Sequence, residues 1–389
     1  MCRSNLSKLV LVYWLFATAL LLGTMSSPLS ADEPAAKGDA NRVSKDVLSP
    51  KEWKQLDQAV DRGLEFLASK QNRDGSFETI PAGQPAVTSL CVLAFLSRGH
   101  LPGNGPYGEQ LDRAISFVVS CQQRDGAFSY MRPLTNEVSA KSTYYNHAIS
   151  GLMLSEAYGM TETKHHKRIR QAIIKAIPYA RRGQVVRKTD PRNKGGWRYL
   201  RRDALHEADL SITSWFLMFY RSARNAEFDV PKQYVDDAMA YVRRCFYVRK
   251  GGFVYRITRR DRAIATRGGV MGGGIVSLSL GGEHQSEMAQ TAGKWILNHS
   301  FDHYNRTPHI KDRYHYSAFY CSQAMYQLGG EYWSKFYPRL MRTLVANQRS
   351  DGSWAQELRR DMEYGNIYTS ALTVLALTPP YQLLPIFQR

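Results

Sequence analysis

Aromatic side chains recur near the starts of the apolar stretches in this 389-residue chain. Aromatic faces can stabilise a carbocation, and they also bind apolar ligands and sugars. Ordinary packing between helices is the alternative role for each of them. His147, one helical turn beyond Tyr144, is either a hydrogen-bonded core residue or a proton carrier. The aromatic candidates for a ligand site are Tyr144, Tyr145, Trp197, Tyr199, Trp215, Tyr316, Tyr320, Tyr364 and Tyr368.

Arg267 precedes a glycine-rich sequence, Gly268-Gly269-Val270-Met271-Gly272-Gly273-Gly274. Backbone amides at a helix start beside an arginine can bind a phosphate or pyrophosphate. Close helix packing would explain the same glycines. The spacing matches neither a Walker sequence nor a dinucleotide fingerprint, and the common hydrolase and metal motifs do not occur. The sequence therefore predicts no metal site and no cofactor.

The first 31 residues have the pattern of a secretory signal. Arg3 and Lys8 form a basic region, residues 9–23 are apolar, and small residues lead to a cleavage site near Ala31. An apolar run of that length is short for a membrane span, which needs about 20 residues. We expect cleavage rather than anchoring, and a periplasmic or cell-envelope location for the mature protein.

The chain is strongly basic. Its formal charge is +18, which falls to +16 when Arg3 and Lys8 are removed, and nine Lys or Arg residues lie between Lys164 and Lys188 without an acid among them. Such a surplus favours anionic partners such as a membrane or envelope surface. A solvated helix face is the alternative. Export makes nucleic acid an unsuitable partner, and composition does not define the oligomeric state.

Four cysteines remain after the predicted cleavage: Cys91, Cys121, Cys245 and Cys321. An even number permits two disulfides in an oxidising compartment. Each lies in an apolar helical context, so buried free thiols are equally compatible with the sequence.

A turn of the form Asp-Gly-x-aromatic recurs along the chain. Residues 71–77, 123–128 and 348–354 are near copies, and residues 194–197 and 250–253 are weaker ones. The aromatic positions 77, 128, 197, 253 and 354 are separated by 51, 69, 56 and 101 residues, so we predict a degenerate copy at residues 300–304. Glycine supplies a left-handed conformation after a helix, so the turn indicates architecture rather than chemistry.

Each turn is preceded by an amphipathic helix and followed by a more uniformly apolar one. The first amphipathic helix opens with the capping box Ser49-Pro50-Lys51-Glu52. The other amphipathic helices are predicted to begin near Glu109, His165, Pro231, His284 and Glu331. The apolar helices are predicted over residues 86–96, 144–158, 210–223, 270–280, 316–328 and 367–377.

Helices that are apolar on nearly every side belong inside a fold. We therefore predict an all-α fold in which six inner helices are wrapped by six outer helices in a closed ring. An open solenoid is the alternative, but it would need polar terminal repeats, and the terminal repeats are no more polar than the others.

The pattern resembles the terpenoid cyclase and protein prenyltransferase superfamily, whose squalene-cyclase-type repeats have a Gln-x-x-Asp-Gly-x-[Phe/Trp] turn between paired helices. The resemblance covers most of residues 50–380. It implies an α/α toroid of six helical hairpins with a central cavity that accepts isoprenoid chains. One such ring matches the size of a prenyltransferase β subunit.

Triterpene cyclases of this superfamily protonate an alkene or epoxide with an acid from an Asp-x-Asp-Asp-Thr-type motif. That step needs an acid held in its protonated form. The resemblance assigns the role to Glu207 and Asp209, although Leu210 replaces the third acid. Asp209 could instead cap the following helix or contact a polar ligand group. A bond from its carboxylate to the amide of residue 211 or 212 would indicate a cap.

Protein prenyltransferases hold zinc with an Asp, a Cys two residues later and a distant His. No Asp-x-Cys occurs here, although residues 314–321 resemble the histidine-containing helix and make His315 a possible ligand-binding residue. His315 and Cys321 do not share a helical face, because neighbours on a face lie three or four residues apart. A zinc site is therefore not expected.

These features predict a signal peptide at residues 1–31, a linker at 32–48, a toroid at 49–380 and a tail at 381–389. The leading hypothesis is an exported protein that binds a hydrophobic, isoprenoid-type ligand and carries out acid-assisted chemistry if it is an enzyme. The alternatives are a non-catalytic binding or scaffold protein and, by analogy with other α/α toroids, a protein that acts on an envelope polysaccharide.

Overall fold

The computed structural model describes residues 47–160, 164–201, 204, 206–258, 267–299, 301–307, 312–357 and 364–388. The chain divides into Met1–Ala40 and a compact unit, Asn41–Arg389, and the fold described here is that of the second. The predicted signal peptide and most of the predicted linker lie outside the described residues. None of the described helices is long and apolar enough to cross a membrane.

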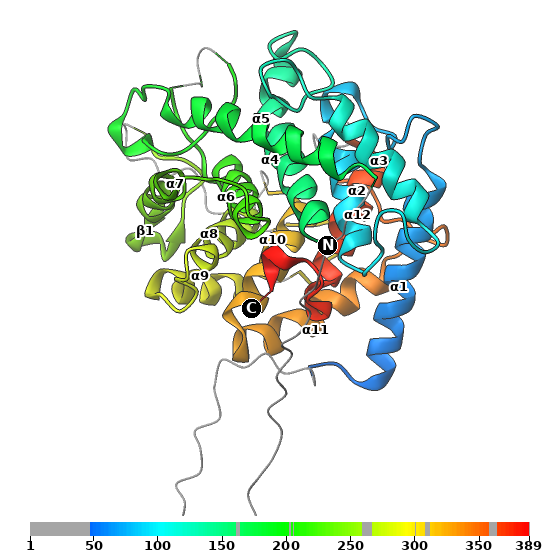
Figure 1. Ribbon diagram of the computed structural model, residues 1–389. Coiled ribbons are helices and arrows are strands. Elements are labelled where there is room, and N and C mark those ends of the chain that lie inside the picture. The colour runs from blue at the N-terminus through cyan, green and yellow to red at the C-terminus, as the bar shows by residue number, and fades with distance from the viewer. Residues whose placement is uncertain are drawn as a thin grey trace, which may run out of the picture. The chain divides into compact units, whose positions relative to one another are not determined.

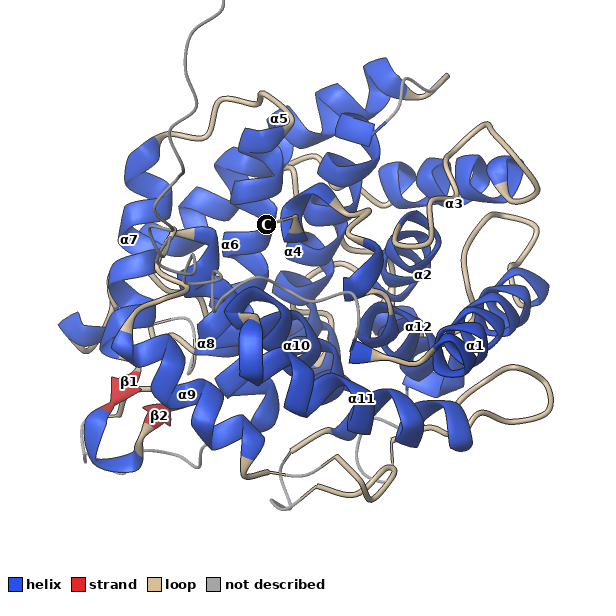
Figure 2. Cartoon of the chain, turned by 90° about the horizontal axis from the view of Figure 1, so that it is seen from below, coloured by secondary structure: helices blue, strands red, loops and turns tan. Residues whose placement is uncertain are grey.

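Twelve α-helices alternate between two layers in the described part of the chain (Figure 1). Figure 2 shows one set around the outside and the other within it. The outer helices are α1 (Pro50–Ser69), α3 (Gly108–Ser120), α5 (His166–Val185), α7 (Lys232–Arg244), α9 (Glu287–Leu297) and α11 (Gly330–Ala346). The inner helices are α2 (Ala86–Leu96), α4 (Glu137–Met160), α6 (Leu210–Asn225), α8 (Gly268–Leu280), α10 (Tyr314–Leu328) and α12 (Gly365–Leu377).

The inner layer closes on itself. Each inner helix packs against the next in chain order, and α12 returns to α2, while α11 contacts α1 in the outer layer. The inner helices are buried on nearly every side, which accounts for their uniformly apolar sequences. The fold is thus the predicted all-α, α/α toroid of six hairpins.

The Asp-Gly turns join neighbouring hairpins through the same contact at several positions. Gly75 has φ +92° and lies so close to the Arg113 carbonyl that an added Cβ would be 2.3 Å from its oxygen. The preceding Gln71 donates through Nε2 to the carbonyl of Gln110 in the next outer helix, at 2.8 Å. The turn therefore fixes the spacing between successive outer helices.

The last turn makes this contact with the first helix of the chain. Gln348 donates through Nε2 to the carbonyl of Ala59 in α1 at 2.8 Å, and Gly352 packs on the carbonyl of Arg62. Since residues 59 and 348 are joined by the bond that joins neighbouring hairpins elsewhere, the array is a closed ring and not an open solenoid.

The aromatic residue of each turn is held by the inner helix that follows. The amide of Phe77 donates to Thr88 Oγ1 at 3.1 Å, and the amide of Trp354 donates to Ser370 Oγ at 3.0 Å. The amide of Phe128 donates in the same way to His147 Nδ1 at 3.2 Å. His147 thus has the same role as Thr88 and Ser370, which is to accept a hydrogen bond from the turn.

The fifth hairpin has a different connection, as the degenerate sequence predicts; Ser300 itself lies outside the described residues. Asn305 takes a left-handed conformation, with φ +56°, without a following glycine. The hydroxyl of Tyr304 accepts from the amide of Ala355 at 2.9 Å. Side-chain contacts to the sixth turn therefore take the place of the Asp-Gly turn.

One inner helix begins earlier than its apolar pattern predicts. α4 starts at Glu137 rather than Tyr144, because Asn136 Oδ1 accepts from the amide of Ser139 at 2.8 Å and so caps a polar first segment. The other helices begin within about three residues of the predicted positions, as is usual for helix ends.

Short elements complete the described chain. They are the 3₁₀ helices η2 (Pro81–Gly83), η3 (Pro191–Asn193), η4 (Val248–Lys250), η6 (Pro379–Tyr381) and η7 (Pro385–Phe387), and the antiparallel strands β1 (Phe246–Tyr247) and β2 (Gly252–Phe253). η7 packs against α4 and α6, and the amide of Ile386 donates to the buried Glu156 at 3.1 Å. Cys91, Cys121, Cys245 and Cys321 are buried free thiols.

Candidate functional site

A cavity of about 960 Å³ lies at the N-terminal ends of the inner helices. Its volume falls near the top of the usual range for ligand pockets, about 300–1,000 Å³. Apolar side chains on the wall come from α2, α4, α8 and α12: Ala86, Val87, Leu90, Val138, Ile149, Val270 and Leu372. The aromatic side chains on the wall are Tyr145, Tyr199, Trp215, Tyr255, Tyr316, Tyr364 and Tyr368. The cavity is thus apolar with a large aromatic component.

A hydroxyl network from three helices crosses the aromatic wall. Tyr145 on α4 donates to Ser211 Oγ at 3.0 Å, and Ser211 shares a hydrogen bond of 2.6 Å with the Tyr316 hydroxyl on α10. Trp215 lies one turn after Ser211 on α6 and donates through Nε1 to Tyr316 at 3.1 Å. Burial raises the pKa of Tyr316 to about 12. The network therefore presents neutral donors and acceptors to a bound molecule.

Asp209 does not belong to the cavity wall. It is fully buried, and its Oδ1 accepts from the amide of Ile212 at 2.9 Å, which makes Asp209 the N-cap of α6. Its Oδ2 accepts from Arg198 Nη1 at 2.5 Å. A bond from the carboxylate to the amide of residue 212 is the geometry expected of a helix cap, so Asp209 acts as one.

The charge on Asp209 is matched within the protein. Burial raises the pKa of this carboxyl above its usual range, and Arg198, the Ile212 amide and Tyr255 offset that rise only in part. Arg198 also donates to the Tyr255 hydroxyl at 2.6 Å. An arginine stays protonated in proteins, so the Arg198 charge opposes protonation of Asp209, and both oxygens of the carboxyl are already engaged by Ile212 and Arg198.

Glu207 lies beside this pair and is half-buried. It accepts from Arg256 Nη1 at 2.8 Å, and its carboxylate is 3.8 Å from Arg198 Nε. Glu207 is not among the residues that line the cavity. Neither predicted acid therefore faces the space in which a ligand would bind.

The glycine cluster is a packing surface in the structure. The amide of Gly268 donates to Asp312 Oδ2 and that of Gly269 to Ser317 Oγ, both at 2.8 Å. A Cβ on Gly272 would lie 2.5 Å from the carbonyl carbon of Tyr320, so glycine allows α8 and α10 to approach closely. Backbone amides are therefore not open to a phosphate here.

Arg267 itself lines the cavity. Its guanidinium lies over the Tyr255 ring, with Cζ 4.9 Å from the ring centroid. Within the described part of the chain, its buried Nε has no hydrogen-bond partner. A buried donor without an acceptor is costly, and a polar ligand group would supply the missing acceptor.

The predicted histidines serve the protein core. His147 Nε2 lies 3.2 Å from the Ala176 carbonyl, and His315 Nδ1 lies 2.8 Å from Thr373 Oγ1. Burial lowers the pKa of each to about 3, so both are neutral. In the described ranges, no group of three or more His, Cys, Asp or Glu side chains is placed to hold a metal ion.

The structure separates the predicted ligand-binding residues into two groups. The first group lines the cavity: Tyr145, Tyr199, Trp215, Arg267, Tyr316, Tyr364 and Tyr368. Tyr144, His147, Trp197, His315 and Tyr320 are buried outside its wall.

Tyr255 is a wall residue that the sequence candidates do not include. It lies two residues after the turn aromatic Phe253, as Tyr199 does after Trp197. This shared offset is the signal that could have identified it. The polar wall residues Lys141, Asn146, Asp312 and Arg313 have no comparable signal.

No family model matches the sequence, and no curated protein matches it. Solved structures do match the fold. The type II terpene cyclase MstE from Scytonema, with the product merosterolic acid A, aligns with a TM-score of 0.55 and 14% identity over 86% of this chain and all of that one. The same cyclase has been solved with the substrate geranylgeranyl dihydroxybenzoate.

Other solved structures share the same architecture, and one of them is a glycosidase. A glycosidase aligns with a TM-score of 0.57 and 11% identity, over 87% of this chain and 100% of that one. A protein from Listeria innocua aligns with a TM-score of 0.56 and 11% identity, over 84% and 98% of the two chains. At these identities the similarity establishes the α/α toroid and not an activity.

Proposed function

We propose that this protein binds a hydrophobic, isoprenoid-type small molecule in its central cavity and acts as a binding protein rather than a cyclase. The observation that carries the proposal is the composition of the cavity: apolar helix surfaces and seven aromatic rings surround about 960 Å³. Burial of apolar ligand surface contributes about 25 cal/mol per Å² before the costs of binding are subtracted. A prenyl chain supplies such surface. The terpene cyclase similarity supports this ligand class.

The position of Asp209 favours binding over acid-assisted cyclisation. An acid that protonates an alkene must reach the ligand in its protonated form. Asp209 instead caps α6 and pairs with Arg198 behind the cavity wall. Glu207 is held by Arg256 in the same region.

The described cavity wall does not have the pair of carboxyl groups that polysaccharide hydrolysis usually requires. Most glycosidases use two carboxyl groups on either side of the bond that is cleaved. Asp312 is the carboxylate among the described lining residues, and its oxygens accept from Gly268, Arg313 and Ser317. We therefore do not extend the glycosidase activity to this chain.

Mass spectrometry of lipids that co-purify with the protein tests the proposal. We expect an isoprenoid, sterol or polyprenyl species in the wild type, and little of it in Ala86→Trp, where an indole enters the cavity. Asn104→Trp adds the same side chain at an exposed loop position and should retain the ligand. Absence of all three lipid classes from the wild type, or equal retention by both variants, would contradict the proposal.

A further inference from the structure

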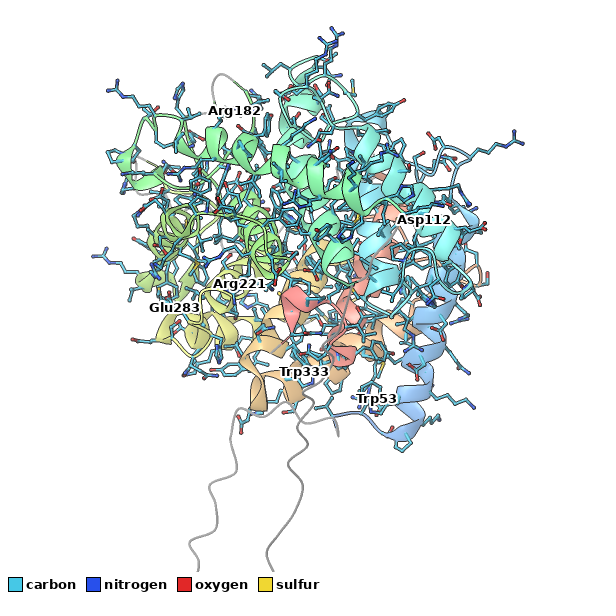
Figure 3. The ribbon with its side chains drawn as sticks, viewed as in Figure 1. Trp53, Asp112, Arg182, Arg221, Glu283 and Trp333 are labelled. Carbon is cyan, nitrogen blue, oxygen red and sulfur yellow. The ribbon has the colours of Figure 1, made fainter. Side chains whose placement is uncertain are left out.

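The exposed face of α5 combines basic and apolar side chains. At about 100° per residue, Ile174, Pro178 and Val185 lie close to one line along the helix. Ile174 is 45% exposed and Val185 57% exposed, and Pro178 is exposed as well. Arg170 lies on one side of this line, and Lys175 and Arg182 lie on the other. Figure 3 shows Arg182 at the periphery of the folded unit.

The cations of this face lack the ion pairs that other outer helices have. Lys232 pairs with Asp236 on α7 at 2.7 Å, and Lys335 pairs with Glu331 on α11 at 2.8 Å. Among the residues that the structure describes, no carboxylate lies within ion-pair distance of the exposed α5 cations. These are Lys167, Arg168, Arg170, Lys175 and Arg182, which we call the α5 basic face together with Ile174, Pro178 and Val185.

The hydrogen bonds of this face leave its charge uncompensated. Arg168 donates to Ser116 Oγ at 3.4 Å, and Arg182 donates to the backbone carbonyl of Asp125. Neither acceptor carries a charge. The α5 basic face therefore presents five positive charges around exposed apolar side chains, along a helix whose opposite face is buried in the ring.

We propose that the α5 basic face docks the protein on an anionic lipid bilayer. Cations beside an apolar line are the arrangement of helices that lie in a membrane interface: lysine and arginine contact anionic head groups, and apolar side chains enter the acyl boundary. A soluble polyanion would neutralise the charge and leave Ile174 and Val185 in water. A bilayer accommodates both, and this decides the class of partner.

Co-sedimentation with vesicles tests this surface. The full chain is mixed with vesicles of phosphatidylglycerol and phosphatidylcholine, and separately with phosphatidylcholine alone, at about 0.1 M salt, where long-range charge effects are screened. We expect binding to the anionic vesicles only. Replacing Lys167, Arg170, Lys175 and Arg182 by Gln should weaken that binding about tenfold or more.

Matched controls separate a specific surface from net charge. Replacing Lys51, Lys54, Arg73 and Arg249 by Gln removes the same charge from exposed positions elsewhere and should retain most of the binding. The pair Ile174→Ser and Val185→Ser keeps the charge and should also weaken binding, whereas Val248→Ser with Leu383→Ser, at other exposed apolar positions, should not. Thermal melts confirm that each variant is folded.

Three results would overturn the proposal. The first is equal loss of binding in the two charge variants, because net charge alone would then explain the attraction. The second is unchanged binding of the Ile174→Ser and Val185→Ser variant, which would indicate a polyanion site. The third is failure of the wild type to bind anionic vesicles. None depends on the cavity, so the two proposals fail or succeed separately.

Discussion

Arg198 donates to Asp209 at 2.5 Å, and together they form an ion pair buried behind the cavity wall. Burial acts to lower the pKa of Arg198, but the charge and hydrogen bond of Asp209 together with Tyr255 and Tyr199 outweigh it, and the pKa is raised. The same carboxylate caps α6, which supplies Ser211 and Trp215 to the hydroxyl network. The pair therefore positions one part of the cavity wall rather than reacting with a ligand.

Loss of either partner of this pair should destabilise the fold. Arg198→Met leaves a buried carboxylate without its cation, and we expect the free energy of unfolding to fall by about 3 kcal/mol. Asp209→Asn keeps a capping side chain but leaves a buried cation, so a comparable loss is expected. Urea unfolding followed by circular dichroism measures both, and the double variant should lose less than the sum. Strictly additive losses would show that the residues do not act as a pair.

Glu156 should make the stability depend on pH. Burial raises its pKa from 4.5 to about 7, against hydrogen bonds from Ser222 and the Ile386 amide. Below pH 4.5 both folded and unfolded states are protonated. As the pH rises from about 4.5 to 7 the unfolded state releases this proton first, so stability falls by about 3 kcal/mol, the equivalent of the shift.

Glu156→Gln resembles the neutral acid and should remove that loss. We expect the variant to unfold at higher urea concentration than the wild type at pH 8, and at a similar concentration at pH 4.5. Urea midpoints measured across this range provide the test. A wild type whose stability rises between pH 5 and pH 7 by as much as that of the variant would rule out the role assigned to Glu156.

The closed ring predicts that its last junction is as important as an internal one. Gln348→Ala removes the hydrogen bonds to the carbonyls of Ala59 and Gly352, and Gln71→Ala removes the equivalent bonds at the first turn. Each half-buried set should contribute about 1 kcal/mol or more, because the carbonyls lose their donor. In a closed ring, the two variants should lose equal free energies of unfolding, as measured by urea unfolding. A negligible effect of Gln348→Ala alone would indicate that the ring opens at this junction in solution.

Arg267 should distinguish ligands by their polar end. Its Nε faces no acceptor among the described residues, so a carboxylate or phosphate on the ligand would pair with it. Arg267→Gln is expected to weaken binding of an anionic isoprenoid by about 1.5–3 kcal/mol and that of the neutral alcohol much less. Titration calorimetry with geranylgeranyl phosphate and geranylgeraniol makes the comparison. An equal effect on both ligands would show that Arg267 shapes the cavity and does not bind the anionic group of the ligand.

The sequence predicted most of the architecture because the elements repeat. Each turn needs a glycine, with a glutamine before it and an aromatic residue after it, so the same residue types recur in several hairpins. These residues act within the turn and its immediate neighbours, so they can be recognised from the sequence. The apolar inner helices follow from their composition. α4 was predicted to start seven residues late, since its first two turns are polar and Asn136 caps them.

The candidate site was predictable only in part. The candidates that line the cavity are Tyr145, Tyr199, Trp215, Arg267, Tyr316, Tyr364 and Tyr368. Tyr144 is adjacent to Tyr145 in the sequence but points away from the cavity, where it packs against Phe216 and Tyr179. A helical residue's direction depends on where the neighbouring helices lie, and periodicity loses its information when a helix is apolar all round.

By itself, the sequence determined the helical hairpins, their number and the turns between them, because these depend on local backbone preferences and on the apolar pattern of each segment. Only the tertiary structure decided that Gln348 donates to the Ala59 carbonyl and that Arg198 forms an ion pair with Asp209. It also decided that Asp312 and Ser317 accept hydrogen bonds from the amides of the glycine cluster. Each of these contacts joins residues from different helices or connecting segments. Their partners are set by how the ring closes, which no local pattern in the chain encodes.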